Sequence, residues 1–489
     1  MSFIKKLFNA SISLDNLNEF IQNNSVEIYD FFISQKNSSI NNHRVEIENF
    51  ILPKYNVFRD LDFTNTKNQT FLFCLIDVSQ RFGLATEFQQ LFNLAKKNNV
   101  PLNNRLNAAS LFLIGINNIN NYSDRINEIL TKLTVSFLKE EDNEQKTVAT
   151  LIQFYTEVFK NFEHNKSGVS LFKQKLIEEL QKDDFKFLNT EIVQEILYYS
   201  LDDIDELYDI IQNKLDEILE RASEFLAFNI EPHLIESDTE YSSLINEISA
   251  NFIEIRNLSA TLYSKVSNDE IFWSLQRGVK VLTEQNQLLA YLNSYGKMHQ
   301  AKIMSAITVI NENDLKNEIE IYDWGCGQGL ASMCLLEYFK NQKYDYSLGK
   351  ITLIEPSEIA IKRASLHVRK FNENCQIITL NKDLDSLNDI DFDNNLKNTK
   401  IHLFSNILDI DLFSMTKLIS LIKNNFKGSN IFICVSPFVS EVKTERIEGF
   451  VNSFSNLSKF NLKTNISERN GEWTGKTWSR VVRVFNVDI

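Results

Sequence analysis

The sequence predicts a mostly parallel α/β sheet in the last third of the chain, preceded by a large all-α region. Two observations support this division. Only four of the 13 glycines precede Gly296, and glycine is the residue that most often marks turns and interrupts helices. From Glu318 onward, short apolar runs alternate with amphipathic segments, a pattern that indicates parallel strands joined by helices.

The first region shows apolar residues at helical spacing. Its clearest helix is expected over 204–228, and the opposite face of that helix is acidic, which is typical of a solvated surface. We find no fixed-period repeat, so the region is expected to be an irregular helical array rather than a named solenoid. The apolar face comprises Ile204, Leu207, Ile211, Leu215 and Ile218, and further helices are expected at Leu84–Asn98, Leu102–Ile116, Ser123–Leu138, Val148–Phe162 and Thr190–Tyr199.

Three domains are expected along the chain. Pro232 interrupts the helical pattern and indicates a boundary. Residues 1–235 are therefore assigned to the all-α region, residues 236–310 to a helical bridge, and residues 311–489 to the α/β domain. The size of the all-α region suits recognition of a protein or another large substrate, although a fold alone does not establish a function.

Composition excludes several classes of function. The formal net charge of −14 argues against binding nucleic acid through overall electrostatic attraction, although a local basic groove stays open. No run of about 18 uncharged apolar residues appears, and the N-terminal segment lacks a secretory pattern, so we expect a cytoplasmic protein that does not enter membranes. The five cysteines and six histidines are scattered without ligand spacing, so no metal site is predicted.

The strongest motif lies where the first expected strand, Ile319–Asp323, runs into a glycine-rich loop and then a helix. Gly325 suits a tight turn with positive φ, and Gly327 allows a ligand to approach the backbone. Gly329 allows the helix to begin close to the strand. The N-terminus of the following helix favours a carboxylate or a phosphate.

Acidic residues flank this loop. Asp323 precedes it, and Glu355 ends the second expected strand, Ile351–Glu355, where it is placed to accept hydrogen bonds from ribose hydroxyls. Further strands are expected at Gln376–Leu380, Ile401–Ser405, Asn430–Val435, Phe460–Ser467 and Trp478–Val487.

With these motifs, the segment from about Tyr295 to Ile489 resembles the S-adenosylmethionine-binding domain of class I methyltransferases. The resemblance implies a doubly wound, Rossmann-like, mostly parallel seven-stranded sheet and S-adenosylmethionine as cofactor. It implies contacts to methionine from Asp323, Gly325, Cys326, Gly327 and Gly329, to ribose from Glu355 and Pro356, to adenine from Asp383 and Leu384, and to the sulfonium and substrate from Ser405 and Asn406.

An aromatic and basic cluster precedes the first strand. Tyr295, His299 and Lys302 are candidates to contact the carboxylate of the cofactor. The alternative, weighted equally, is an ordinary helix end whose cations complement the helix dipole.

Several alternatives stay open. A nicotinamide dehydrogenase is disfavoured because Leu330 stands where its third glycine would be. The fourth strand lacks the Pro-Pro motif of adenine and cytosine amino methyltransferases. A non-catalytic scaffold or assembly factor, including one of the ribosome-associated type, is the alternative to an active methyltransferase. No catalytic base is assigned among His402, Asp409 and Asp411, and the acceptor and the oligomeric state are left undetermined.

Overall fold

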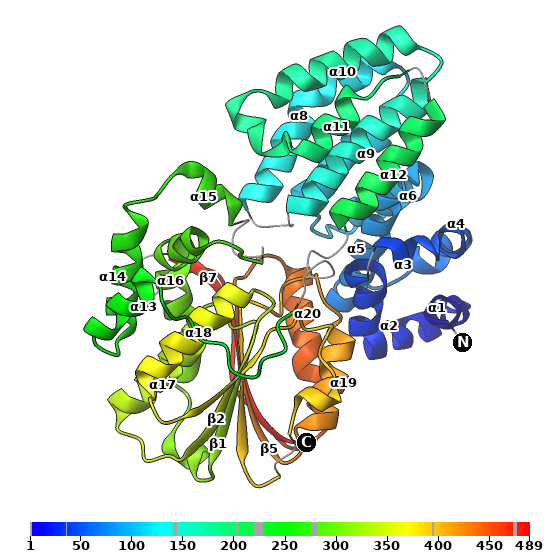
Figure 1. Ribbon diagram of the computed structural model, residues 1–489. Coiled ribbons are helices and arrows are strands. Elements are labelled where there is room, and N and C mark those ends of the chain that lie inside the picture. Colours follow the sequence, from blue (N-terminus) through cyan, green and yellow to red (C-terminus); the bar gives the residue numbers. More distant parts are fainter. Residues whose placement is uncertain are drawn as a thin grey trace. The chain divides into compact units, whose positions relative to one another are not determined.

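The computed structural model describes residues 2–35, 37–139, 144–201, 204–219, 228–275, 281–393, 396–472 and 477–489. Clustering of the chain by proximity separates two compact units, Met1–Arg221 and Ala222–Ile489 (Figure 1). Among the described residues, every helix is too short or too polar to cross a bilayer.

The first unit is helical, as predicted. The expected helix at 204–228 is observed as α12, which ends at Leu219, whereas Phe228 is not helical and residues 220–227 lie outside the described ranges. The helices are α1 (Phe3–Ala10), α2 (Leu14–Tyr29), α3 (Asn37–Asn41), α4 (Arg44–Arg59), α5 (Thr66–Arg81), α6 (Ala85–Lys97), α7 (Asn104–Leu113), α8 (Ile119–Leu138), α9 (Glu144–Phe162), α10 (Lys166–Leu180), α11 (Glu191–Tyr198) and α12 (Ile204–Leu219), with a π-helix at Asp30–Ser34 and a 3₁₀ helix at Asp183–Leu188.

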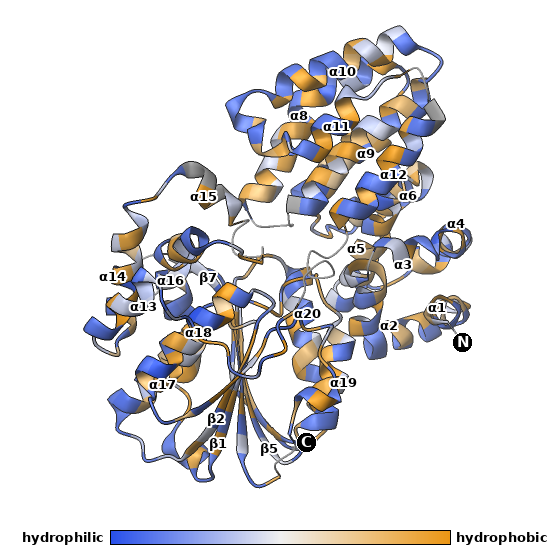
Figure 2. Cartoon of the chain, viewed as in Figure 1, coloured by the Kyte–Doolittle hydropathy of each residue, from blue (hydrophilic) through white to orange (hydrophobic). Residues whose placement is uncertain are grey.

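Amphipathic helices build this unit. In Figure 2, helices such as α8 and α9 carry hydrophobic and hydrophilic residues side by side, as expected for helices that bury one face. Aromatic rings fill part of the interior, where Phe154 lies edge-to-face against Phe172 with ring centroids 5.3 Å apart. Such pairs add directional packing to the burial of apolar surface.

The second unit contains a seven-stranded sheet in the order β3-β2-β1-β4-β5-β7-β6. β1 to β5 are parallel and β7 is antiparallel to both neighbours, which confirms the predicted mostly parallel sheet. The strands are β1 (Ile319–Trp324), β2 (Leu348–Ile354), β3 (Gln376–Leu380), β4 (Thr399–Ser405), β5 (Ser429–Ser436), β6 (Ser458–Glu472) and β7 (Thr477–Asp488).

Helices accompany the strands, as the crossovers of a parallel sheet require. After the sheet begins, they are α17 (Leu330–Gln342), α18 (Glu358–Phe371), α19 (Met415–Asn425) and α20 (Glu441–Asn452). Before it lie α13 (Glu240–Leu244), α14 (Phe252–Tyr263), α15 (Asp269–Ser274) and α16 (Gln285–Ile307), and 3₁₀ turns occupy Ile245–Glu247, Glu312–Leu315 and Asp389–Asp391.

The residues before β1 share the hydrophobic core of the sheet. Ile255 of α14 and Ile303 of α16 are fully buried in one cluster with Ile321 of β1 and Leu335 of α17. Much of the segment predicted as a bridge therefore contributes side chains to the same core as the strands.

The segment 229–236 runs along β3, the edge strand of the sheet. The Thr379 amide donates to the carbonyl of Pro232 at 2.9 Å, and the Leu234 amide donates to Thr379 Oγ1 at 2.8 Å. At the end of the segment, Glu236 forms a buried ion pair with Arg363 of α18. These contacts fasten the segment to the second unit.

A layer of aromatic rings lies between the sheet and α19 and α20. Trp324 is fully buried, stacks on Phe404 with ring centroids 5.6 Å apart, and donates from Nε1 to His402 Nδ1 at 3.2 Å. His402 in turn stacks on Phe432. These aromatic rings pack against the carboxyl end of β1, where the glycine-rich loop begins.

Candidate active site

The three glycines of the loop all have positive φ, but they face different surroundings. A Cβ on Gly329, where φ is 76°, would lie 3.2 Å from Ala364 Cα, so glycine lets α17 begin against α18. A Cβ on Gly325 would lie 2.9 Å from the side chain of Ile407. A Cβ on Gly327, where φ is 52°, would meet no atom within 4 Å. Packing thus explains two of these glycines and leaves open space at the third.

Glu355 borders that open space. Its Oε2 accepts from the Gly327 amide at 3.0 Å, and its Oε1 accepts from the Ser357 amide at 3.0 Å. Burial raises the pKa of Glu355 to about 7. The two amide hydrogen bonds favour the carboxylate and act in the opposite direction, but their effect on the pKa is smaller than that of burial. The side chain is therefore held beside the loop in a fixed orientation.

Asp323 is 1% exposed and holds the start of α17. Its Oδ2 accepts two hydrogen bonds from Ser332, one from the amide at 3.2 Å and one from Oγ at 2.7 Å. Burial raises the pKa of Asp323 to about 6. These bonds show a structural role in positioning the helix, and the predicted contact of Asp323 with a ligand stays a prediction.

Asn381, which the sequence reasoning missed, joins the ends of β2 and β3. Its Nδ2 donates to the carbonyls of Glu355 at 3.0 Å and Pro356 at 2.9 Å. The position directly after β3 was the available signal, because loops at the carboxyl ends of parallel strands line the sites of such sheets. Nearby, Asp383 accepts from the Ser386 amide at 2.7 Å and Leu384 is buried, so both predicted adenine contacts lie in one turn.

Lys302, Ser405 and Asn406, predicted separately, are brought together. Lys302 lies on α16, is 1% exposed, and its Nζ donates to Asn406 Oδ1. Asn406 has a φ of 59° and donates from Nδ2 to Ser405 Oγ at 3.2 Å. A buried ammonium group therefore fixes the turn that follows β4.

Tyr295 and His299 belong to an aromatic cluster on α16. Their rings stack with centroids 6.1 Å apart, and His299 also lies 3.3 Å from the Tyr291 hydroxyl. Burial, and then the charge of Lys302, lower the pKa of His299, which keeps its imidazole neutral. Burial, and then Glu355, Tyr295 and Asp409, raise the pKa of Tyr291.

The sequence reasoning did not single out Tyr291. The signal was its spacing, because residues 291, 295 and 299 are four positions apart and share one face of a helix. The carboxylates of Glu355 and Asp409 both contribute to the raised pKa of Tyr291.

Cys326 is packed within the loop rather than poised to react. Its amide donates to the Ile354 carbonyl at 3.0 Å, and burial, followed by the charges of Asp323 and Glu355, raises the pKa of the thiol well above its usual value. Because the thiolate is the reactive form, this environment disfavours a nucleophilic role. Within the described ranges, no group of three or more potential ligands is arranged to hold a metal ion.

The structure separates the three candidate bases. His402 is fully buried in the aromatic layer, where burial lowers its pKa to about 3. Asp411 is paired with Lys443 at 2.5 Å. Asp409, in the turn after β4, has a buried Oδ1 without a hydrogen-bond partner in the described structure. Of the three, Asp409 has an acceptor atom that is not used for folding.

No protein-family model matches the chain, and no curated protein matches it. Among solved structures, the chain is similar to a ribosomal protein L11 methylase from Lactobacillus delbrueckii subsp. bulgaricus, with 15% identity, coverage of 38% of this chain and 76% of that chain, and a TM-score of 0.24. A putative class I S-adenosylmethionine-dependent methyltransferase from Listeria monocytogenes shows 12% identity, coverage of 51% and 87%, and a TM-score of 0.30.

A third similar structure is the plantazolicin methyltransferase BpumL in complex with SAH, with 11% identity, coverage of 50% of this chain and 99% of that chain, and a TM-score of 0.28. The second unit itself has a mostly parallel seven-stranded α/β fold. At these identities the similarity concerns the fold alone.

Proposed function

We propose that the second unit binds S-adenosylmethionine at the glycine-rich loop and transfers its methyl group to an acceptor. The observation that carries this proposal is the open space at Gly327 beside the Glu355 carboxylate. The positive φ of Gly327 favours glycine, and the open space around it leaves room for a ligand to lie against the backbone.

The residues present fit this cofactor. Glu355 presents carboxylate oxygens to the ribose hydroxyls, and the turn that holds Asp383 and Leu384 lies after β3, where the adenine would be. Lys302 and the N-terminus of α17 contribute positive potential for the methionine carboxylate. Each of these groups lies at the end of a strand or on a helix that is anchored in the hydrophobic core.

When bound, the cofactor supplies an electrophilic methyl group on a sulfonium. A nucleophilic atom of the acceptor would receive this methyl group. The protein's contribution is to align the acceptor with the methyl group. We assign Asp409 to orient the acceptor or to take its proton, because its Oδ1 is buried without a hydrogen-bond partner in the described structure.

The first unit is proposed to select a macromolecular acceptor. Support comes from its size and from its compactness as a unit of its own, which would give it a recognition surface distinct from that of the second unit. The formal net charge of −14 favours an acceptor other than a bare phosphate backbone.

The test is calorimetric titration of the full chain with S-adenosylmethionine and S-adenosylhomocysteine. Saturable binding by the wild-type protein is expected, together with at least about tenfold weaker binding by Glu355→Gln, because a charge-assisted hydrogen bond is worth about 1.5–3 kcal/mol. The matched control is Glu373→Gln, which removes the same charge from an exposed site. Absence of binding by folded wild-type protein would reject the cofactor.

Turnover distinguishes an enzyme from a scaffold that merely binds the cofactor. Radiolabelled methyl groups are expected to enter a macromolecular fraction with the wild-type protein, and not with Asp409→Asn, which should still bind S-adenosylmethionine. Binding without any incorporation would favour the scaffold.

A further inference from the structure

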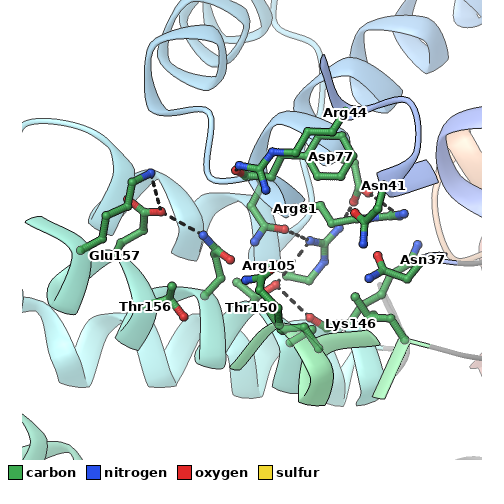
Figure 3. Close-up of a pocket in the computed structure, with 18 of the residues that line it drawn as sticks. Asn37, Asn41, Arg44, Asp77, Arg81, Arg105, Lys146, Thr150, Thr156 and Glu157 are labelled. Carbon is green, nitrogen blue, oxygen red and sulfur yellow. Dashed lines mark hydrogen bonds and ion pairs between the residues drawn. The ribbon is translucent and has the colours of Figure 1, made fainter. Parts of the chain in front are cut away.

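Buried polar networks occur in both units. In the first unit, Arg105 pairs with Asp77 beside a cavity of about 250 Å³ (Figure 3). In the second unit, Tyr241 and His367 form a chain of hydrogen bonds that ends on the glycine-rich loop. Of these two networks, the second reaches the proposed cofactor site, so its residues can influence the binding of a ligand there.

His367 lies on α18, is fully buried, and contacts the backbone of the loop. Its Nδ1 lies 2.8 Å from the carbonyl oxygen of Gln328, and its Nε2 lies 2.7 Å from the hydroxyl oxygen of Tyr241 on α13. Burial, followed by the charge of Arg363, lowers the pKa of His367 to about 3, so the imidazole is neutral near neutral pH. A neutral imidazole has one nitrogen that donates and one that accepts.

The two partners of His367 determine which nitrogen carries the hydrogen. A carbonyl oxygen can only accept, so Nδ1 donates to Gln328, and Nε2 is left to accept from the Tyr241 hydroxyl. The Tyr241 oxygen also lies 3.4 Å from Ser259 Oγ on α14. The Tyr241 hydroxyl thus selects the tautomer of His367 that bonds to the loop.

The peptide group that His367 contacts belongs to the turn around Gly327. The Gly329 amide donates to the Cys326 carbonyl at 2.7 Å, which closes a four-residue turn with Gly327 and Gln328 at its centre. The peptide group between Gln328 and Gly329 is therefore held at its carbonyl and at its amide. Because a peptide group is planar, these two bonds fix the backbone next to Gly327, where a Cβ would meet open space.

Tyr241 is anchored by contacts outside the loop. The guanidinium of Arg363 lies over its ring, 3.5 Å from the centroid, and Arg363 pairs with Glu236 in the segment along β3. Gln285 of α16 also accepts from Arg363 at 2.6 Å. The hydroxyl that bonds to His367 therefore has a fixed position.

We propose that His367 and Tyr241 are positioning residues for the cofactor: they hold the peptide group between Gln328 and Gly329 in the orientation that leaves the backbone at Gly327 open to the ligand. This inference rests on the proposed function, because it concerns the affinity of the same loop for S-adenosylmethionine. Both residues act through the loop backbone.

The test is calorimetric titration of the full chain with S-adenosylmethionine in two variants of His367. The amide of asparagine reaches the position of Nδ1, so His367→Asn keeps a donor for the Gln328 carbonyl and should bind only about threefold more weakly than the wild type. The longer glutamine reaches the position of Nε2. His367→Gln leaves the buried carbonyl without its donor and should bind at least about tenfold more weakly.

The matched control is Ser365→Ala on the same helix. It removes a buried hydroxyl that has no hydrogen-bond partner in the described structure, and it should bind as the wild type does. Both His367 variants lose one buried hydrogen bond, so denaturant unfolding of the ligand-free protein should show similar losses of stability. Equal affinities of the two His367 variants would overturn the inference, whereas absence of binding by the wild type would reject the proposed function itself.

Tyr241→Phe replaces His367→Gln if the latter does not fold. It keeps the ring and removes the donor to Nε2, so it should bind about threefold more weakly, and an unchanged affinity would contradict the inference. The imidazole nitrogens give a further readout. The nitrogen-15 resonances of His367, assigned by their absence in His367→Asn, should show a hydrogen on Nδ1 and none on Nε2. A hydrogen on Nε2 would refute the inference, because Nδ1 could then not donate to the loop.

Discussion

At the scale of single residues, burial governs the two acids that flank the glycine-rich loop. Glu355 and Asp323 are both enclosed, and their pKa values are raised to about 7 and about 6. A raised pKa means that the folded state holds the proton more tightly than the unfolded chain does. The free energy of unfolding therefore falls as the pH rises through the interval between the unfolded and folded pKa values.

We predict that Glu355→Gln reduces the pH dependence of stability in the ligand-free protein. The contribution of Glu355 should be lost between about pH 4.5 and pH 7 in the wild type, whereas a glutamine cannot titrate and lacks this contribution. Thermal unfolding followed at pH 5 and pH 8 measures the difference. Glu373→Gln should retain the wild-type difference, and an unchanged difference in Glu355→Gln would contradict the assigned pKa.

The sequence identified residues whose position follows from a single strand and the loop after it. Glu355 directly follows β2 and Gly327 lies three residues after β1, so motif spacing was enough to place both at the ends of strands. Motif spacing could not pair Asp77 with Arg105, because these residues lie on different helices 28 positions apart, nor show that Asp409 Oδ1 is buried without a hydrogen-bond partner in the described structure. Such contacts depend on tertiary packing, which spacing along one element does not encode.

At the scale of elements, the start of α17 depends on the atoms that surround each glycine of the loop. Gly329 lies against the backbone of Ala364, while Gly327 faces open space. The same substitution at the two positions should therefore affect different properties.

We predict that Gly329→Ala destabilises the second unit by about 3 kcal/mol, through strain at positive φ and overpacking against α18. Gly327→Ala should cost only about 1 kcal/mol of strain, but should weaken S-adenosylmethionine binding because its methyl group occupies the ligand's space. Denaturant unfolding followed by tryptophan fluorescence measures the stability of the second unit, because all four tryptophans lie after residue 221. Equal losses of stability in both variants would refute the distinction.

Element positions were predicted well where hydrophobic periodicity was strong. β3 has the bounds expected from sequence, and β1, β2 and β4 differ by three residues or fewer at either end. β6 extends to Glu472, beyond the expected Ser467, because pairing with β7 continues past the apolar part of the strand. Backbone pairing between strands, rather than side-chain pattern, sets that length.

At the scale of the whole molecule, the sheet shares its core with helices that precede it in the chain. The sequence placed the start of the α/β domain at residue 311, shortly before the strand-like runs begin at Glu318. The fully buried Ile255 and Ile303 lie before that point and pack with β1 and α17. Composition marks where strands begin, but it does not reveal which earlier helices cover them.

We predict that a fragment of residues 229–489 folds and binds S-adenosylmethionine, whereas a fragment of residues 311–489 does not fold. The shorter fragment loses α14 and α16, and with them apolar contacts that the sheet cannot replace. Circular dichroism and calorimetry of both fragments measure the outcome. A folded, ligand-binding 311–489 fragment would show that these helices are dispensable.

The segment along β3 also bears on how the protein behaves in a crowded cell. An open strand edge is a template on which another chain can add a strand, and proline is one of the residues that block such growth. Pro232 lies over β3, accepts a hydrogen bond from Thr379, and has no amide hydrogen to pass on. A chain that lacked residues 229–236 would expose this edge, so loss of a few residues outside the glycine-rich loop would make the protein prone to aggregate by strand addition.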